Sequence, residues 1–353
     1  MPLPDPLQPG ENPLLASVIA FGEEEVVGLL RIHFTADDLA RTTMAAAADP
    51  LWEVVLSRFR LRDRDKALAY RSWERGLRRS PERVARMGAG VRWLMALAPE
   101  GPYFPDFLTP EAARDGLEAG LSALRSTPRR RFRWELGWLA RYAPVAGWVG
   151  GLGDGEVTSV EGLATALSDY YGAAIAPHGE HIRAAVEADR AWRVGHLLSG
   201  GVEALLNGLR PTMRWRPPVL EVDYTLDRDL HLHGRGLRLV PSYFCRRVPV
   251  ALADPELSPV LVYPIDAAFR WTPGTRAPGS LEALVGDSRA AVLQAARGGA
   301  TTTELARRAG VSIAAASRHA KVLREAGLVR SVRRGPAVLH LLTPLGTGLL
   351  EPS

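Results

Sequence analysis

Aspartate and histidine alternate over one short stretch of the chain, at Asp227, Asp229, His231 and His233. Alternate residues of a strand point to the same face, so a strand here would present two carboxylates and two imidazoles together. Such groups can bind a transition metal or exchange protons near neutral pH. A solvated or hydrogen-bonded strand face is the commoner use of this pattern, and we therefore predict no metal site and no cofactor.

Motifs that mark the common enzyme classes are missing from the sequence. Its single cysteine, Cys245, excludes a disulfide framework and a zinc site built on several thiolates, and we interpret it as a small core residue. Neither lysine, Lys66 or Lys321, follows a glycine, so there is no Walker A motif. The glycines at 151, 153 and 155 are followed by Glu156 and do not form GxGxxG. We therefore expect that the protein is not an enzyme.

Basic residues are concentrated in the last fifth of the chain. Residues 281–353 contain ten arginines and lysines against five acidic residues, which is a net charge of +5. The whole chain has the same net charge, so the preceding 280 residues are neutral overall. A basic module attached to a neutral body is typical of proteins that bind nucleic acid.

Start and stop signals in this basic region predict a series of short elements. Thr301 and Glu304 have the spacing of a capping box, which opens a helix through Ala309. Gly310 supplies the left-handed residue that a sharp turn needs, and Ser312 caps a further helix to about Ala326. A helix at 288–297 precedes these two; strands at 328–334 and 337–342 and a last helix from Thr343-Pro344 follow them. This order is that of a winged helix-turn-helix.

The helix at 312–326 is expected to enter the major groove of double-stranded DNA with its first turns at the base edges. Arginine can bond guanine or phosphate, serine can donate or accept, and an alanine methyl can touch thymine. Arginines at the wing tip can reach phosphates or the minor groove. The predicted DNA-binding residues are Thr302, Thr303, Ser312, Ala314, Ala315, Ser317, Arg318, His319, Lys321, Arg333 and Arg334.

The stretch TTTELARRAGVSIAAASRHAKVLREAGLVRSVRRGPAVLHLLTPLG, Thr301–Gly346, resembles the winged-helix regulators of the ArsR type. Upstream, LRIHFTADDLART, DPLWEVVLS and much of 216–265 are similar to an actinobacterial-type subgroup with a long N-terminal domain. The resemblance implies transcriptional regulation. It does not imply metal sensing, because the thiolates of the metal-sensing members are absent here.

The rest of the chain is predicted to be a mostly helical N-terminal region with a β-rich segment. With the winged helix that follows it, the whole chain is predicted to have a mixed α+β fold. We expect a tail at 1–26, a regulatory or assembly domain at 27–275 that is helical over 64–210 and β-rich over 211–270, and a DNA-binding domain at 281–353. Within it we predict a strand at 27–34, a helix capped by Thr35 and Asp38 through about Ala47, and a helix at 50–60. Helix starts are expected near Asp63, Ser80, Thr109, Thr127, Thr158 and Pro177, a loop at 147–155 and a linker at 270–280. We expect the first strand to share a sheet with the later strands.

Trp134, Trp138 and Tyr142 recur every four residues on one helical face. They could wall a pocket for an apolar or aromatic effector, although such stripes more often belong to a core. The apolar run at 14–21 is too short to cross a bilayer and has no basic flank, which favours a cytoplasmic protein with no membrane partner.

These patterns favour a sequence-specific DNA-binding transcriptional regulator, a one-component repressor that acts as a homodimer and responds to an unknown small-molecule effector. Two alternatives stay open. The N-terminal region could be an enzyme or ligand-handling domain that the winged helix targets to DNA, or the winged helix could contact another protein in a scaffold.

Overall fold

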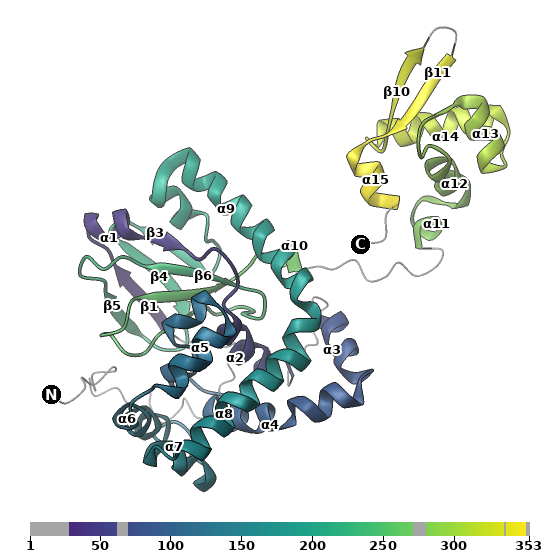
Figure 1. The fold of residues 1–353 in the computed structure, drawn as a ribbon. Helices are drawn as coiled ribbons and strands as arrows, with labels where there is room; N and C mark the ends of the chain where they lie inside the picture. The colour runs from purple at the N-terminus through teal and green to yellow at the C-terminus, as the bar shows by residue number, and fades with distance from the viewer. Residues whose placement is uncertain (1–27, 62–69, 271–279, 335–336, 351–353) are drawn as a thin grey trace. The chain divides into compact units, whose positions relative to one another are not determined.

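The computed structural model describes residues 28–61, 70–270, 280–334 and 337–350, which form two compact units, 1–271 and 272–353 (Figure 1). The expected tail and most of the expected linker lie outside the described residues, as does the helix start near Asp63. The fold is mixed α+β, as the sequence predicts.

One sheet of the first unit joins a strand from the start of the chain to three from its β-rich segment. Its order is β3 (Met213–Arg216), β4 (Val219–Tyr224), β1 (Gly28–His33) and β5 (Arg228–His231). The strand β1 runs antiparallel to β4 and parallel to β5, which confirms that the first strand shares a sheet with the later ones. Leu30, Ile32, Leu220 and Val222 alternate with more exposed residues, so one face is buried and the other is polar.

A second sheet lies between two apolar cores. Its order is β2 (Thr43–Met44), β6 (Arg238–Ser242), β8 (Val260–Pro264) and β7 (Val250–Ala251). Leu261 and Tyr263 of β8 pack into the core shared with the first sheet, whereas Val260 and Val262 pack into the helical core. Strands buried on both faces read as continuous apolar runs, which is the pattern of VLVYP.

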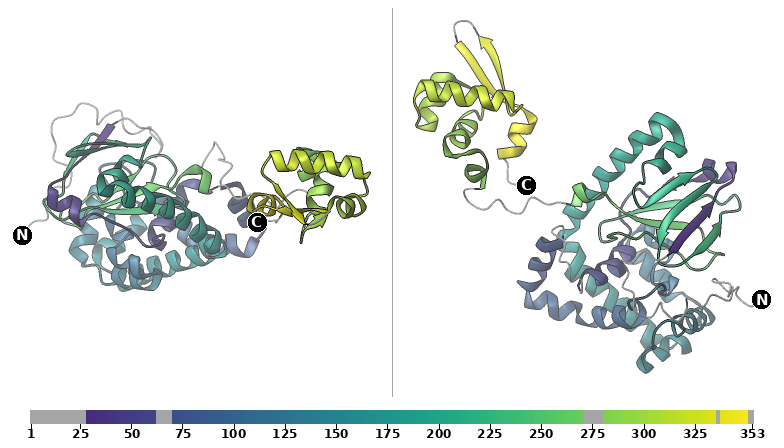
Figure 2. Two further views of the ribbon diagram at one scale, coloured as in Figure 1. Left: turned by 90° about the horizontal axis from the view of Figure 1, so that it is seen from above. Right: turned by 180° about the vertical axis from the view of Figure 1, so that it is seen from behind.

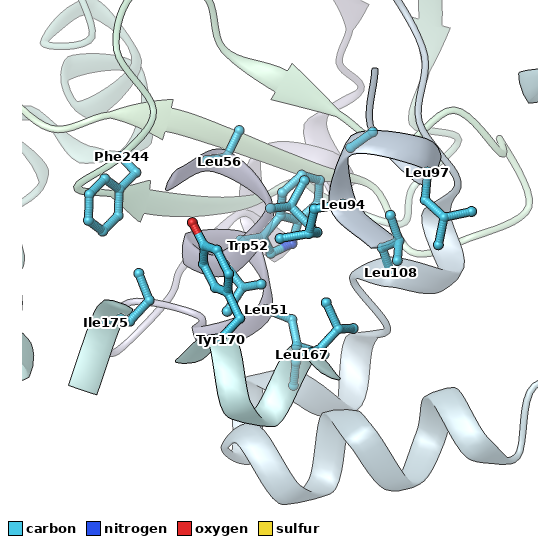
Figure 3. Close-up of a cluster of buried hydrophobic side chains, with 14 of the residues drawn as sticks. Leu51, Trp52, Leu56, Leu94, Leu97, Leu108, Leu167, Tyr170, Ile175 and Phe244 are labelled. Atoms are coloured by element: carbon cyan, nitrogen blue, oxygen red, sulfur yellow. The ribbon is translucent and has the colours of Figure 1, made fainter. Parts of the chain in front are cut away.

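Helices cover the other side of this second sheet, below the strands in Figure 1 and again in the two views of Figure 2. The central one is α2 (Pro50–Arg60), which Asp49 caps by accepting from the Leu51 and Trp52 amides at 3.1 and 3.2 Å. Leu51, Trp52 and Leu56 lie among side chains of the surrounding helices (Figure 3). The surrounding helices are α3 (Arg71–Arg78), α4 (Pro81–Leu97), α5 (Leu117–Arg125), α6 (Arg129–Leu139), α7 (Gly150–Asp154) and α8 (Val157–Tyr170).

The helix α9 (Gly179–Asn207) connects the two cores of the first unit, and α10 (Ala267–Arg270) ends the part of that unit that the structure describes. Ile182 and Val186 pack into the helical core, while Leu205 and Leu206 pack against the first sheet. Between them Gly200 and Gly201 leave helical geometry, with φ of −156° and +68°. A φ of +68° is easily adopted by glycine alone, so this pair lets one segment serve both cores.

Two local predictions are wrong. The helix capped by Thr35 is α1 (Ala36–Arg41) and does not reach Ala47, because Thr43–Met44 pairs with β6. The predicted loop at 147–155 is a short 3-10 turn followed by α7, whose Leu152 is fully buried, so packing overrides the weak helix propensity of glycine. The helix start expected near Thr158 is confirmed to within one residue, because α8 begins at Val157.

The described residues of the second unit form five helices and a small sheet. Its helices are α11 (Ser280–Val285), α12 (Asp287–Ala295), α13 (Thr302–Ala309), α14 (Ile313–Glu325) and α15 (Pro344–Leu350). The strands β10 (Val329–Arg334) and β11 (Ala337–Leu342) form a hairpin, and β9 (Ala300–Thr301) pairs with β11. Leu293, Leu305 and Leu323, one from each of α12, α13 and α14, meet in its core. The helix α11 was not predicted.

Candidate nucleic-acid interface

The corner between α13 and α14 is built by local hydrogen bonds that the sequence predicts. The Thr301 hydroxyl accepts from the Glu304 amide at 3.3 Å, and the Glu304 carboxylate accepts from the Thr301 amide at 2.7 Å. Gly310 ends α13 with φ of +63°, and the Ser312 hydroxyl accepts from the Ala315 amide at 3.1 Å. Two satisfied caps around a left-handed glycine hold the two helices at a fixed angle.

One face of α14 is buried and the opposite face is open to solvent. Ala316, Ala320 and Leu323 pack inside the unit. Among the predicted DNA contacts, Ala315 and His319 are half-buried, and the exposed ones on this helix and its cap are Ser312, Ala314, Ser317, Arg318 and Lys321. The structure therefore brings these residues together along one surface of α14.

Arg318 is the exposed cation of this surface whose guanidinium is not committed elsewhere. Among the described residues, none forms an ion pair or hydrogen bond with it. Lys321 lies 3.9 Å from Glu325 in an exposed pair, which costs little to break. By contrast, Arg297 and Arg308 donate to the carbonyls of Leu350 and Ala295 at 2.9 and 3.0 Å, so these two brace the unit itself.

The wing is a regular antiparallel hairpin in which Arg333 lies opposite Val338. The Arg333 side chain is exposed, as is that of Arg330 nearer the base. The side chain of Arg334 and the turn at 335–336 lie outside the described residues. The structure thus places one of the two predicted wing arginines on the outside of the hairpin.

The first turn of α13 holds the remaining predicted contacts. Thr303 is exposed, whereas Thr302 is half-buried, and its hydroxyl lies 3.0 Å from Nε2 of His340. Sequence reasoning missed His340, although a histidine among the leucines of a predicted strand is a signal for a buried polar contact. Hydrogen bonds from Thr301 lower the pKa of Glu304, which therefore carries its negative charge at the start of α13.

The aromatic stripe predicted as an effector pocket packs against the helical core of the first unit. Trp138 is buried, and Trp134 and Tyr142 are half-buried beside the same core. The Arg141 guanidinium lies 4.1 Å from the ring centre of Trp138. Burial of this kind is what a core stripe requires, and the pocket stays a prediction.

Of the aspartate–histidine pattern, only Asp229 and His231 lie on the strand β5, and His33 of β1 joins them; Asp227 precedes the strand and His233 lies in the turn after it. His33 Nε2 lies 2.6 Å from a carboxylate oxygen of Asp229, and the His33 ring stacks on His231 at 4.3 Å. Within residues 28–61, 70–270, 280–334 and 337–350, no three histidine, cysteine or acidic side chains are arranged to hold a metal ion. No helix among these residues is long and apolar enough to cross a membrane.

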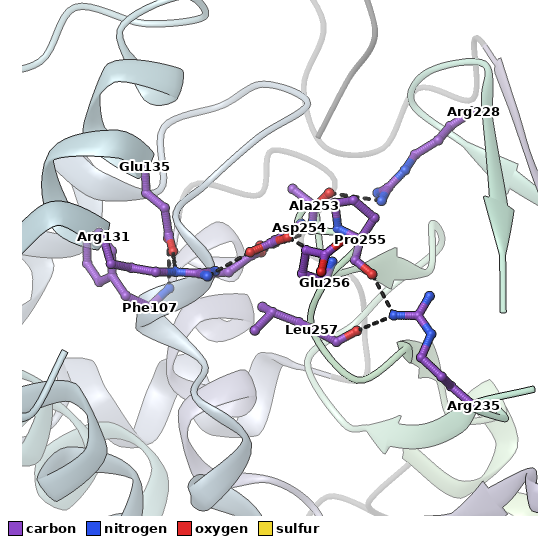
Figure 4. Close-up of polar contacts among 11 residues, drawn as sticks. Phe107, Arg131, Glu135, Arg228, Arg235, Ala253, Asp254, Pro255, Glu256 and Leu257 are labelled. Atoms are coloured by element: carbon purple, nitrogen blue, oxygen red, sulfur yellow. Dashed lines mark hydrogen bonds and ion pairs between the residues drawn. The ribbon is translucent and has the colours of Figure 1, made fainter. Parts of the chain in front are cut away.

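Buried carboxylates in the first unit support the segment between β7 and β8 (Figure 4). Asp106 accepts from the amides of Ala253 and Asp254, and Arg131 pairs with both Glu135 and Asp254, the latter at 2.7 Å. Glu135 also accepts from the Phe107 amide at 2.9 Å. Burial, followed by the charge of Asp106, raises the pKa of Glu135 to about 8. Three carboxylates around one arginine retain a proton more readily than isolated ones.

From the opposite side, Arg228 of β5 and Arg235 of the turn after β5 hold the same segment by its backbone. Arg228 donates to the carbonyls of Leu252 and Ala253 at 2.9 and 3.0 Å (Figure 4). Arg235 donates to the carbonyls of Pro255 and Leu257 at 2.6 and 3.2 Å. Together with the buried carboxylates on the helical side, these hydrogen bonds join the helices to the first sheet through the segment between β7 and β8.

Comparison with known proteins finds one match in the second unit. Residues 284–332 match a family model described as a helix-turn-helix domain, which covers α12, α13, α14 and the first part of β10. No curated protein and no solved structure matches the chain. The match and the geometry agree that the second unit contains a helix-turn-helix domain of the DNA-binding kind.

Proposed function

We propose that the protein is a sequence-specific transcriptional regulator of the ArsR type that reads the major groove of double-stranded DNA with α14. The observation that carries the proposal is the surface of α14, where Arg318 stands uncommitted beside exposed Ser317 and Lys321. A side chain without partners in the unbound protein can bond a base edge without first breaking another interaction. The net charge of +5 over residues 281–353 supplies the attraction to phosphate.

The proposal includes a homodimer and a one-component repressor. One recognition helix reads few base pairs, and two helices on paired half-sites raise both affinity and specificity. The first unit would then sense a small molecule or mediate assembly, with no catalytic role. Half-sites would lie about 10 base pairs apart, centre to centre, if the two helices enter successive major grooves on one side of the duplex.

The experiment is selection of binding sites by the full-length protein from a random DNA library. We expect an enriched inverted repeat, and a protein–DNA complex that contains two copies of the chain by sedimentation. Recovery of no enriched sequence from a library that a control regulator resolves would refute sequence-specific reading.

A second candidate function, contact of α14 with another protein, is favoured by two apolar side chains on the same helix. Ile313 and Val322 are 57% and 42% exposed. If α14 contacts another protein, DNA binding is expected to be weak, and Ile313→Ser should abolish binding of the partner protein while leaving the affinity for DNA unchanged. The charge of the unit is the reason to rank DNA first.

A further inference from the structure

His340 joins the wing to the first turn of α13 through both of its ring nitrogens. The side chain is 5% exposed and stands on β11, opposite Ser331 of β10 and Ala300 of β9. Nδ1 lies 2.9 Å from the Ser331 hydroxyl oxygen, and Nε2 lies 3.0 Å from the Thr302 hydroxyl oxygen. A single buried ring therefore connects two hydroxyls on different elements.

The direction of these two hydrogen bonds is not free, because a neutral imidazole has one N–H and one lone pair. If Nδ1–H donates to Ser331, the Thr302 hydroxyl must donate to Nε2, and its proton is then used inside the protein. If Nε2–H donates to Thr302, the Ser331 hydroxyl donates to Nδ1. In this second arrangement the Thr302 proton is available to a further acceptor.

Thr302 is well placed to meet such an acceptor. It is the first residue of α13, beside the exposed Thr303, where helix amides and the helix dipole favour an anion. We propose that His340 is a positioning residue of the DNA interface: by donating from Nε2 to Thr302, it turns the Thr302 hydroxyl outward as a donor to a backbone phosphate. The inference rests on the proposed function, because it assigns a task within the same interface.

A phosphate at Thr302 would in turn act on the ring. Burial, and to a smaller extent the charge of Arg324 on α14, lowers the pKa of His340, so the ring is neutral in the free protein at neutral pH. The other charged residues of the elements around it are Glu304, Arg307 and Arg308 on α13, Arg330, Arg333 and Arg334 on β10, and Arg318, Lys321 and Glu325 on α14. The Glu304 carboxylate is bonded to Thr301. The short strand β9 carries no charged residue.

Negative charge next to Nε2 favours the protonated ring, which still donates to both hydroxyls. DNA binding therefore raises the pKa of His340 from its lowered value, and by linkage binding takes up a proton. The affinity then increases as the pH falls through the pKa of the bound state, by up to about tenfold for each unit by which the pKa rises.

The test is fluorescence anisotropy of the full-length protein on its selected site, at pH 6 and pH 8, with three variants. Thr302→Val removes the hydroxyl at nearly constant volume. His340→Leu removes both bonds, and His340→Gln keeps one donor and one acceptor but cannot be protonated. We expect Thr302→Val and His340→Leu each to weaken binding about tenfold at pH 6, and the double variant to be no weaker, because both remove one interaction.

At pH 8, His340→Gln should bind DNA with most of the wild-type affinity that His340→Leu loses. Its affinity should increase less than that of the wild type between pH 8 and pH 6, because glutamine cannot be protonated. His319→Gln is the matched control, since His319 is a second histidine of the same unit and is half-buried on α14. Equal pH dependence in wild type and His340→Gln, or effects of Thr302→Val and His340→Leu that multiply, would overturn the inference.

The outcome separates this inference from the proposed function. If wild type shows no sequence-specific binding at either pH, both fail. If wild type binds specifically and depends on Arg318 but Thr302→Val binds equally well, only the role of His340 fails. Thr302→Val carries this result even if His340→Leu does not fold, because Thr302 is only half-buried.

Discussion

Two glycines of α4 allow the packing of the helical core to be tested with a matched pair of substitutions. A Cβ at Gly90 would lie 2.6 Å from the carbonyl oxygen of Ala166 and 2.6 Å from Cβ of Tyr170, both on α8. These atoms are backbone or next to it, so α4 and α8 would have to separate. At Gly88, two residues earlier and exposed, a Cβ would meet nothing within 4 Å.

Alanine is favoured over glycine in a helix by up to about 1 kcal/mol, and this gain applies at both positions. For Gly88→Ala it is the whole effect, so we expect a stabilisation of about 0.5–1 kcal/mol. For Gly90→Ala it is opposed by overpacking, which costs roughly 1–3 kcal/mol and more when backbone must move. The propensity gain cancels between the two variants, so we expect Gly90→Ala to be less stable than Gly88→Ala by about 1–3 kcal/mol, the cost of overpacking.

The assay is guanidinium unfolding of the full-length chain followed by tryptophan fluorescence. All nine tryptophans lie within residues 52–271 and none in 272–353, so the signal reports the first unit alone. The difference is read from the transition midpoints at equal slope. Equal midpoints for the two variants would refute the close approach of α4 and α8. DNA binding should be unchanged in both variants and serves as the control for the second unit.

Two further predictions concern one unit each. The first unit should become less stable as the pH rises from about 4.5 to about 8. The reason is the raised pKa of Glu135: over this range the folded state keeps a proton that the unfolded state loses. Glu135→Gln should therefore make the stability detected by tryptophan fluorescence depend less on pH over the same range. A profile as steep in Glu135→Gln as in wild type would assign the effect to other carboxylates. Gly310→Ala places a Cβ on a residue with φ of +63° and should destabilise the second unit by about 1 kcal/mol. We expect faster hydrogen exchange across α13 and α14 of the full-length chain. The control is Gly162→Ala, because Gly162 is a helical glycine at which a Cβ would meet open space.

The helix-turn-helix was predictable because its signals are local. A capping box needs residues three apart, and the corner needs a glycine at one position, so Thr301, Glu304, Gly310 and Ser312 could be interpreted without knowing the fold. His340 could not, since its partners Thr302 and Ser331 are 38 and 9 residues away and meet it only when β11 pairs with β10. Polar contacts between elements are set by register, which composition does not reveal.

In the first unit the long-range pairings were the part that could not be predicted. The sequence predicted a strand at 27–34 and a β-rich segment at 211–270, but not that β1 pairs antiparallel with β4 and parallel with β5. The early end of α1 follows from a pairing with β6 about 195 residues away, which no local propensity at Thr43 indicates. Glu135 likewise reads as a surface residue until its bond to the Phe107 amide is seen.

The central claim is that α14 reads a DNA sequence through Arg318. The most direct measurement is the ratio of affinities for the selected site and a scrambled duplex, determined by anisotropy across a salt series for wild type, Arg318→Ala and the charge-matched control Arg289→Ala on α12. A bidentate base contact is worth about 1–3 kcal/mol, so we predict that Arg318→Ala reduces the ratio roughly 5- to 150-fold while Arg289→Ala leaves it unchanged. A ratio equally high in Arg318→Ala, or reduced equally in both variants, would contradict base reading by this helix.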